Sequence, residues 1–210
     1  MKVVLVHGIG RTRWSFLFLV RRLSAAGHNP EVFSYSAVSE SHADILARLV
    51  ARLQLLAGSG GEVGLVGHSF GGLLLREAVA LVPELRVKHL VMLATPNRRP
   101  RLAGAYIRLP FRVVHGSCAH CLAAPAWFRA LPTLAVPYTV VAGTGGWRGR
   151  LSPFKGEPND GALAVSETML TENDRPVLVP IIHTFIMNSR LVHRLIRERL
   201  AGVEEGAVRD

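Results

Sequence analysis

Short apolar runs alternate along the chain with longer segments in which apolar residues recur at the spacing of a helix. The runs are rich in valine and contain few polar positions, which is typical of strands buried on both faces of a parallel sheet. Six strands are predicted, at residues 3–6, 31–35, 63–66, 89–93, 138–142 and 177–181. This pattern predicts an α/β fold with about six mostly parallel strands and helices on both faces of the sheet.

Four helices are predicted between and after these strands, at residues 14–26, 41–56, 69–82 and 187–200. The first ends at Gly27, a residue common at helix C-termini. The second begins with Ser41 and Asp44 at the spacing of a capping box and carries its apolar residues on one face.

Two stretches interrupt the alternation. Residues 98–137 are rich in proline, alanine and arginine, with a short helix predicted around residues 119–130. Residues 143–158 are rich in glycine and proline and are expected to form a long loop, which is usually functional in a compact domain. The length of 210 residues favours a single domain over residues 1–210. Within it, residues 98–137 are expected to form a small cap or to border the substrate pocket.

The net charge is +10 at pH 7, and arginine supplies most of the excess. Such a charge suits a nucleic-acid or anionic-membrane partner, or a solvated surface on which arginines are dispersed. The arginines are spread along the chain, with local clusters at 98–101 and 194–199, and no nucleic-acid-binding motif accompanies them. We therefore expect a dispersed basic surface and no nucleic-acid partner, and leave open a weak contact with anionic membranes.

The longest apolar run, residues 16–20, is too short to span a bilayer and is followed by Arg21 and Arg22. No secretory signal is recognisable before the first motif, so a cytoplasmic location is expected.

The two cysteines, Cys118 and Cys121, form a lone CxxC pair. A structural zinc site needs four ligands, and the chain has no second cysteine pair. We expect two ordinary thiols, kept apart in a reducing cytosol, and no metal.

The strongest chemical motif is Gly67-His68-Ser69-Phe70-Gly71, which follows the third predicted strand and opens a helix. This is the setting of a nucleophile elbow, in which a serine oxygen projects above the sheet. Glycines two residues to either side leave room for the tight turn, and the helix N-terminus favours developing negative charge. We therefore expect Ser69 to be a nucleophile. The alternative is a glycine-rich turn with an incidental serine.

A second motif, His7-Gly8-Ile9-Gly10, directly follows the first predicted strand. Acyl transfer needs N–H donors aimed at the carbonyl oxygen as it becomes an oxyanion. In a fold with such an elbow, one donor is the amide after the nucleophile, here Phe70, and Ile9 is the best candidate for the other. His7 is expected to orient this loop rather than to act as a base, because it precedes the nucleophile in the chain.

The acid and the histidine of a triad are expected after the nucleophile, in that order. Asp160 follows the fifth predicted strand on a turn, where the acid belongs. Asp174 lies just before the last strand, at the opposite edge of the sheet, and is interpreted as a solvated turn residue. Glu157 and Glu167 remain alternatives.

Two histidines follow the aspartate in the chain. His183 lies directly between the last strand and the last helix, the usual place for the general base. His193 lies within the last helix among three arginines, which predicts a solvated helix face. We therefore expect His183 to be the base, against the alternative of a satisfied core histidine.

These motifs resemble those of the small lidless bacterial lipases and esterases of the α/β-hydrolase superfamily. The similarity lies in VHGIG at 6–10, GHSFGG at 67–72, PNDGALAVSET at 158–168 and HTFIMN at 183–188, and residues 98–137 are outside it. It implies a reduced sheet of six parallel strands and a triad of Ser69, Asp160 and His183.

The expected function is cleavage of a carboxylic ester, from a small molecule or a lipid, through an acyl-enzyme on Ser69, with no cofactor. Apolar residues beside the expected catalytic positions, among them Ile9, Phe70 and, for substrate binding, Trp14 and Phe185, suggest an apolar acyl pocket. Two alternatives remain, a thioesterase or acyltransferase, and a binding protein that keeps the hydrolase fold without turnover.

Overall fold

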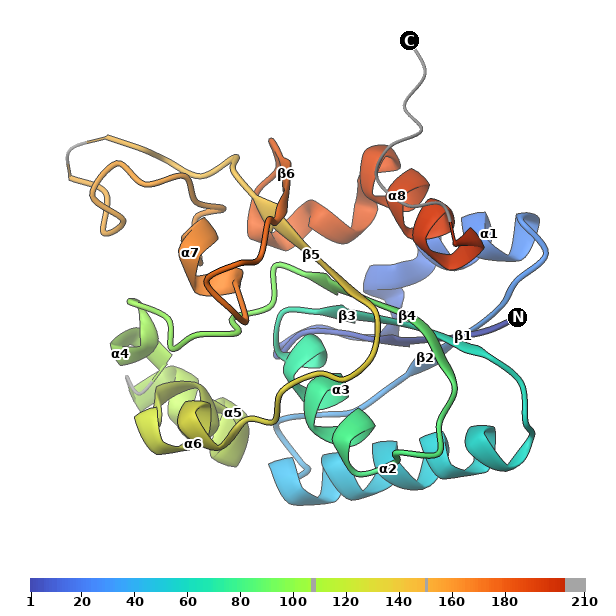
Figure 1. Ribbon diagram of the computed structural model, residues 1–210. Coiled ribbons are helices and arrows are strands. Elements are labelled where there is room, and N and C mark those ends of the chain that lie inside the picture. Colours follow the sequence, from blue (N-terminus) through green and yellow to red (C-terminus); the bar gives the residue numbers. More distant parts are fainter. Residues whose placement is uncertain (107–108, 150, 203–210) are drawn as a thin grey trace, which may run out of the picture.

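The computed structural model describes residues 1–106, 109–149 and 151–202. Six strands form one sheet in the order β2-β1-β3-β4-β5-β6, and every neighbouring pair is parallel. The strands are β1 (Lys2–Val6), β2 (Asn29–Phe33), β3 (Val63–His68), β4 (Val87–Leu93), β5 (Tyr138–Gly143) and β6 (Val177–Val179). The predicted α/β fold is thus confirmed (Figure 1).

Helices cover both faces of the sheet (Figure 1). The helices α2 (His42–Gly58) and α3 (Phe70–Ala80) lie on one face, and α1 (Leu17–Ala25) and α8 (Arg190–Ala201) lie on the other. Two short 3₁₀ helices, η1 (Arg13–Phe16) and η2 (His183–Asn188), precede α1 and α8. In the described ranges, no helix has both the length and the apolar character needed to cross a membrane.

Alternate residues of the central strands supply the two halves of the core. Val4 and Val6 of β1 pack with the apolar residues of α2 and α3. Val3 and Leu5 of the same strand pack with those of α1 and α8. All four side chains are wholly buried, and burying one of this size contributes roughly 1.5–3 kcal/mol. Burial on both faces explains why the strands read as unbroken apolar runs.

The edge strands differ from their predicted bounds. β2 ends at Phe33 rather than at residue 35, because the N–H and hydroxyl of Tyr35 bind His7 instead of continuing the ladder. β6 ends at Val179 rather than at residue 181. Pro180 follows it and has no N–H to donate to a sheet.

The first and last helices also differ from prediction. The segment at 14–26 begins as η1 and becomes α-helical at Leu17. The apolar stripe at 187–200 belongs to two elements, η2 and α8. Ser189 divides them, because its backbone is extended and its hydroxyl accepts a hydrogen bond from the N–H of Val192 as an N-cap.

Residues 98–137 contain α4 (Ala103–Tyr106), α5 (Leu109–Ala123) and α6 (Pro125–Ala130), which gather at one end of the sheet (Figure 1). The single helix predicted around 119–130 is wrong, because Ala124 is extended and Pro125 starts a new helix. The role of this segment as a cap or pocket border stays a prediction.

Arg76 of α3 ties this segment to the body of the protein. Its side chain is buried, and its Nε donates to the carbonyl oxygen of Pro132 at 2.6 Å. Its Nη atoms donate to the carbonyl oxygen of Leu131 and to Asn97, each at 3.4 Å. A buried guanidinium needs such acceptors, so Arg76 fixes where residues 131–132 lie against α3.

Candidate active site

Ser69 lies on the sharp turn between β3 and α3. Its φ of 52° and ψ of −122° are a strained conformation for a residue with a side chain, and such strain costs on the order of 1–3 kcal/mol. The N–H of Ser69 donates to the carbonyl oxygen of Leu93 at 2.8 Å, which ties the turn to the end of β4. Strain held in this way is typical of a nucleophile elbow.

The glycines around Ser69 are required by close backbone contacts. A Cβ atom added to Gly67 would overlap the backbone of Gly72, and one added to Gly71 would overlap the carbonyl oxygen of Val6. These are contacts with backbone, so no side-chain rotation would relieve them. The motif thus carries glycine where the turn between β3 and α3 leaves no space for a side chain.

His183 and Asp160 form a hydrogen-bonded chain with Ser69. The Nε2 atom of His183 lies 3.0 Å from Oγ of Ser69, and its Nδ1 atom lies 2.7 Å from Oδ2 of Asp160. The backbone N–H of His183 also donates to the carbonyl oxygen of Asp160 at 2.9 Å. The structure therefore brings together all three residues of the predicted triad, in the order that nucleophilic catalysis needs.

The carboxylate of Asp160 is held by backbone as well as by the imidazole. Its Oδ1 accepts hydrogen bonds from the N–H groups of Ala162 at 2.9 Å and Leu163 at 2.7 Å. The Asp160 side chain is 1% exposed, whereas that of His183 is 19% exposed. The carboxylate thus orients the ring from within the protein, whereas the ring itself is partly exposed.

Asp174 is at the other edge of the sheet, as the sequence indicates. It accepts hydrogen bonds from the hydroxyl of Tyr138, the first residue of β5, at 2.8 Å and from the N–H of Leu170 at 2.7 Å. These bonds, together with those from Thr171, lower the pKa of Asp174 against the opposing effect of its burial. Asp174 therefore closes the turn before β6.

The two glutamates that remained alternatives for the acid have other partners. Glu157 pairs with Arg101 and accepts from the N–H of Ser166 at 3.1 Å. Glu167 accepts from the N–H groups of Ala164 at 2.9 Å and Arg101 at 2.6 Å. Burial raises the pKa of Glu167. Both carboxylates hold loops together, and Asp160 is the acid that contacts the imidazole of His183.

The loop after β1 lies against the nucleophile. A Cβ atom on Gly8 would be 3.1 Å from Cβ of Ser69. Within the described part of the chain, the N–H groups of Ile9 and Phe70 donate to no other residue, and that of Phe70 starts α3, where the first amides lack intrahelical partners. Both amides are thus available as donors, and their oxyanion role stays a prediction.

His7 holds the loop after β1, as the sequence indicates. Its Nδ1 contacts the carbonyl oxygen of Gly8 at 3.0 Å, and its ring stacks on Tyr35 at 4.4 Å between centroids. The Tyr35 hydroxyl donates to the carbonyl oxygen of His7 at 3.0 Å. Burial lowers the pKa of His7, which keeps the imidazole neutral in this position.

His68 is a site residue that the sequence reasoning did not single out. Its Nε2 contacts the carbonyl oxygen of His183 at 3.1 Å, and the two rings are 5.1 Å apart. Burial, followed by the charge of His183, lowers the pKa of His68 well below its usual value. A neutral His68 therefore supports the backbone of His183. Its place beside Ser69 in the motif was the available signal.

The apolar residues expected around the site have different surroundings. Trp14 of η1 is 64% exposed and Phe185 of η2 is 56% exposed, and the two 3₁₀ helices contact each other. Phe70, in contrast, is wholly buried and stacks on Trp127 of α6 at 6.2 Å. The expectation that its ring lines an apolar acyl pocket is wrong, because the ring lies in the core. The substrate-binding role of Trp14 and Phe185 stays a prediction.

His193 corrects another expectation. The sequence predicts a solvated position among arginines, but the residue is 5% exposed and its Nε2 donates to the carbonyl oxygen of Met187 at 2.8 Å. The signal was its spacing, because Ile196 and Leu200, three and seven positions further on, are buried on the same face of α8.

Both cysteines are free thiols in α5. Cys118 is buried and Cys121 is half-buried. Burial raises the pKa of Cys118 to about 11 and that of Cys121 to about 12. A thiol with such a pKa holds almost no thiolate near neutral pH and is a poor nucleophile. Among the residues that the structure describes, no group of three or more histidines, cysteines or acids could hold a metal ion.

The sequence matches the Alpha/beta hydrolase family over residues 3–209, so the chain belongs to this family. No curated protein sequence matches it.

Three solved structures are similar to this one at low sequence identity. A lipase from Bacillus licheniformis, BlEst2 in its mature form, has a TM-score of 0.75 and 19% identity, over 95% of this chain and 91% of that one. A hyperthermophilic esterase from Pyrobaculum calidifontis has a TM-score of 0.62 and 15% identity, over 99% and 77%. Tomato methylketone synthase I, complexed with 2-tridecanone, has a TM-score of 0.63 and 14% identity, over 97% and 98%. At these identities the likeness extends to the fold alone.

Proposed function

We propose that this protein hydrolyses carboxylic esters through an acyl-enzyme on Ser69. The observation that carries the proposal is the hydrogen-bonded chain from Oγ of Ser69 through His183 to the buried carboxylate of Asp160, with distances of 3.0 and 2.7 Å. Such a chain, ending on a strained serine at a helix N-terminus, has the parts that nucleophilic catalysis requires.

The reaction begins when Nε2 of His183 takes the hydroxyl proton of Ser69 and Oγ attacks the ester carbonyl. Asp160 keeps the proton of the free imidazole on Nδ1 and stabilises the imidazolium. The amides of Ile9 and Phe70 donate to the carbonyl oxygen while it carries negative charge. The imidazolium then gives its proton to the departing alcohol. Water, deprotonated by the same ring, attacks the acyl-enzyme and releases the acid and the free serine.

Similar proteins support an ester as the substrate class, since the lipase and the esterase named above share the fold. The methylketone synthase shares it as well, and one fold hosts many activities. The choice of ester therefore rests on the triad geometry. The exposed aromatic rings of Trp14 and Phe185, on the two 3₁₀ helices beside the site, favour an apolar acyl group from a small ester or a lipid.

The test is a panel of p-nitrophenyl esters of increasing acyl length, with an acyl thioester beside it. Wild type should cleave short and medium acyl esters fastest. Ser69→Ala should lose roughly 10³-fold or more of kcat, because among the described residues Ser69 is the only hydroxyl or thiol that hydrogen-bonds to the His183 imidazole. Ser24→Ala, an exposed serine of α1, is the matched control and should match wild type. Equal turnover by Ser69→Ala, or cleavage of the thioester alone, would contradict the proposal.

A further inference from the structure

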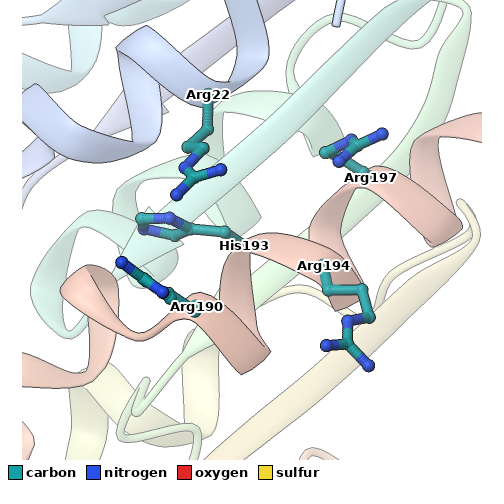
Figure 2. A pocket seen from close by; sticks show the side chains of 5 residues that line it. All are labelled: Arg22, Arg190, His193, Arg194 and Arg197. Carbon is teal, nitrogen blue, oxygen red and sulfur yellow. The ribbon is translucent and has the colours of Figure 1, made fainter.

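The helices α1 and α8 enclose a basic pocket on the face of the sheet opposite α2 and α3. Its volume is about 220 Å³, and five residues line it: Arg22, Arg190, His193, Arg194 and Arg197. Figure 2 shows Arg22 reaching in from α1, and the imidazole of His193 lying between the guanidinium groups of Arg22 and Arg190. Among the residues that the structure describes, no acid lines this pocket. Its walls thus carry four fixed positive charges.

The four arginine side chains have no partners within the described residues, neither a hydrogen bond nor a carboxylate within 4.0 Å. The nearest acid on the same helix, Glu198, lines an adjoining pocket of about 330 Å³ with Arg194 and Arg197. Two of them, Arg22 and Arg190, lie on either side of the His193 ring (Figure 2). Like charges held near one another repel, and a bound anion would offset that repulsion.

His193 is the second, independent observation. Its Nε2 donates to the carbonyl oxygen of Met187, so in the neutral ring Nδ1 carries no proton and has a free lone pair. That Nδ1 is buried and has no hydrogen-bond partner among the described residues. A buried polar atom without a partner costs on the order of 1–3 kcal/mol. A ligand that hydrogen-bonds to Nδ1 would remove this cost.

A bound anion would satisfy both features. An anion with several oxygens accepts hydrogen bonds from more than one guanidinium, and arginine forks suit phosphate oxygens. It would also stabilise a proton on Nδ1 of His193, which would then donate to an oxygen. Without the anion, burial and the charge of Arg22 lower the pKa of this histidine. The charged groups facing the ring are Arg22 from α1 and Arg190, Arg194 and Arg197 from α8.

We propose that this pocket binds a phosphate group through Arg22, Arg190 and the protonated ring of His193. Phosphate is the shared chemistry of two sources, a lipid headgroup and a soluble phosphoester. The site is separate from Ser69, because it lies between α1 and α8 rather than at the end of β3. One link joins the two, since Met187, the acceptor of His193, belongs to the same η2 helix as His183. The proposal does not depend on the proposed ester hydrolysis.

Binding is measured first with inorganic phosphate by calorimetry, at constant ionic strength set with chloride. The informative comparison is Arg22→Gln against Arg21→Gln, because both remove one charge from α1 and Arg21 does not line the pocket. Arg22→Gln should weaken binding roughly fivefold or more, as expected for loss of a charge-assisted hydrogen bond. Arg21→Gln should bind like wild type.

The role of the ring is tested with sulfate, whose charge is constant over this pH range. Wild-type affinity should rise as the pH falls from about 8 to about 6, because binding takes up a proton on Nδ1. The His193→Gln variant keeps an amide N–H for the Met187 carbonyl but lacks Nδ1. It should bind more weakly and show no such pH dependence.

The source of the phosphate is tested by flotation with phosphatidylcholine vesicles, with and without phosphatidic acid. Capture of wild type and Arg21→Gln, but not Arg22→Gln, by the phosphatidic acid vesicles indicates a lipid headgroup. Binding of inorganic phosphate without capture indicates a soluble phosphoester, and both results support the site. No binding at millimolar phosphate together with no capture would overturn it. Equal loss of binding in Arg21→Gln and Arg22→Gln would do so as well, since it would mean a diffuse charge effect.

Discussion

His183 is the first residue of the short helix η2, and His193 of α8 hydrogen-bonds to Met187 of the same η2 helix. Their ring nitrogens nevertheless have different hydrogen-bond partners. Both nitrogens of His183 have side-chain partners, Asp160 and Ser69. His193 has a partner at Nε2, and its buried Nδ1 has none among the described residues, with arginines on either side. One ring lies between a carboxylate and a hydroxyl, as proton transfer requires, and the other between cations, as anion binding requires. The side chains around each ring therefore determine whether it is suited to proton transfer or to binding an anion.

The largest effect expected from this comparison is a loss of kcat on substitution of Asp160. Asp160→Asn should lower kcat by roughly 10³–10⁴-fold, because an amide cannot both hold the ring's tautomer and stabilise its positive charge. Asp174→Asn should change kcat by less than about tenfold, since Asp174 closes a turn at the opposite edge of the sheet. Ester turnover is measured on variants shown by circular dichroism to be folded. A crippled Asp174→Asn beside a mild Asp160→Asn would mean that the wrong acid has been assigned.

The next effect concerns the support of His183 by His68. His68→Ala removes the bond from Nε2 to the His183 carbonyl, and loosening a catalytic group in this way should lower kcat roughly tenfold to a hundredfold with little change in KM. His68→Gln presents an amide N–H at a similar reach and should restore most of the activity. If the alanine and glutamine variants are equally impaired, the bond does not position His183, and His68 serves packing alone.

A smaller effect is expected on stability as the pH changes. The pKa values of His7, His68, His89 and His193 are all lowered in the folded protein, chiefly by burial, and that of His89 is about 4. The unfolded chain therefore binds more protons below its own histidine pKa of about 6.5. The stability they contribute is fully present above that pH and is lost as the pH falls through the folded values.

Thermal melting at several pH values measures this loss. Between about pH 7.5 and about pH 5.5 the Tm should fall by several degrees, since each kcal/mol lost lowers Tm by roughly 2–4 °C in a chain this long. The His89→Gln variant should show a smaller fall, because one of these protonations is removed. A Tm that is constant or that rises toward acid would show that these rings are protonated in the native state.

The sequence predicts the catalytic constellation better than the basic pocket, and the reason is physical. Ser69, Asp160 and His183 each follow a strand of a parallel sheet, and the carboxyl ends of such strands lie together, so chain order alone indicates their proximity. The basic pocket forms between α1 and α8, whose contact depends on side-chain packing across the sheet face. The arginines next to His193 in the sequence suggest an exposed side chain, whereas its helical spacing from Ile196 indicates the buried face of α8. The prediction followed the charge and is wrong, because the ring is buried.

The predicted bounds of helices and strands differ from the structure where a single residue ends or starts an element within an apolar stretch. Pro180 ends β6, Pro125 starts α6, and Ser189 separates η2 from α8. Each acts by removing an N–H or by supplying a cap, effects that hydrophobic periodicity does not record. The burial of Phe70 has another origin, because its ring packs against residues from distant segments, among them His42 and Trp127, the latter from the segment that no family motif covers. A pattern read over neighbouring residues of the sequence does not record such contacts between distant segments.

The most direct test of the account is labelling of the folded protein with a fluorophosphonate probe, followed by mass-spectrometric mapping of the adduct. We expect a single adduct on Ser69, because among the described serines it alone combines an imidazole nitrogen at 3.0 Å with the strained turn of a nucleophile elbow. Labelling should disappear in the Ser69→Ala variant and persist in Ser24→Ala. An adduct on another serine, or no adduct on folded wild-type protein, would contradict the assignment of Ser69 as a nucleophile.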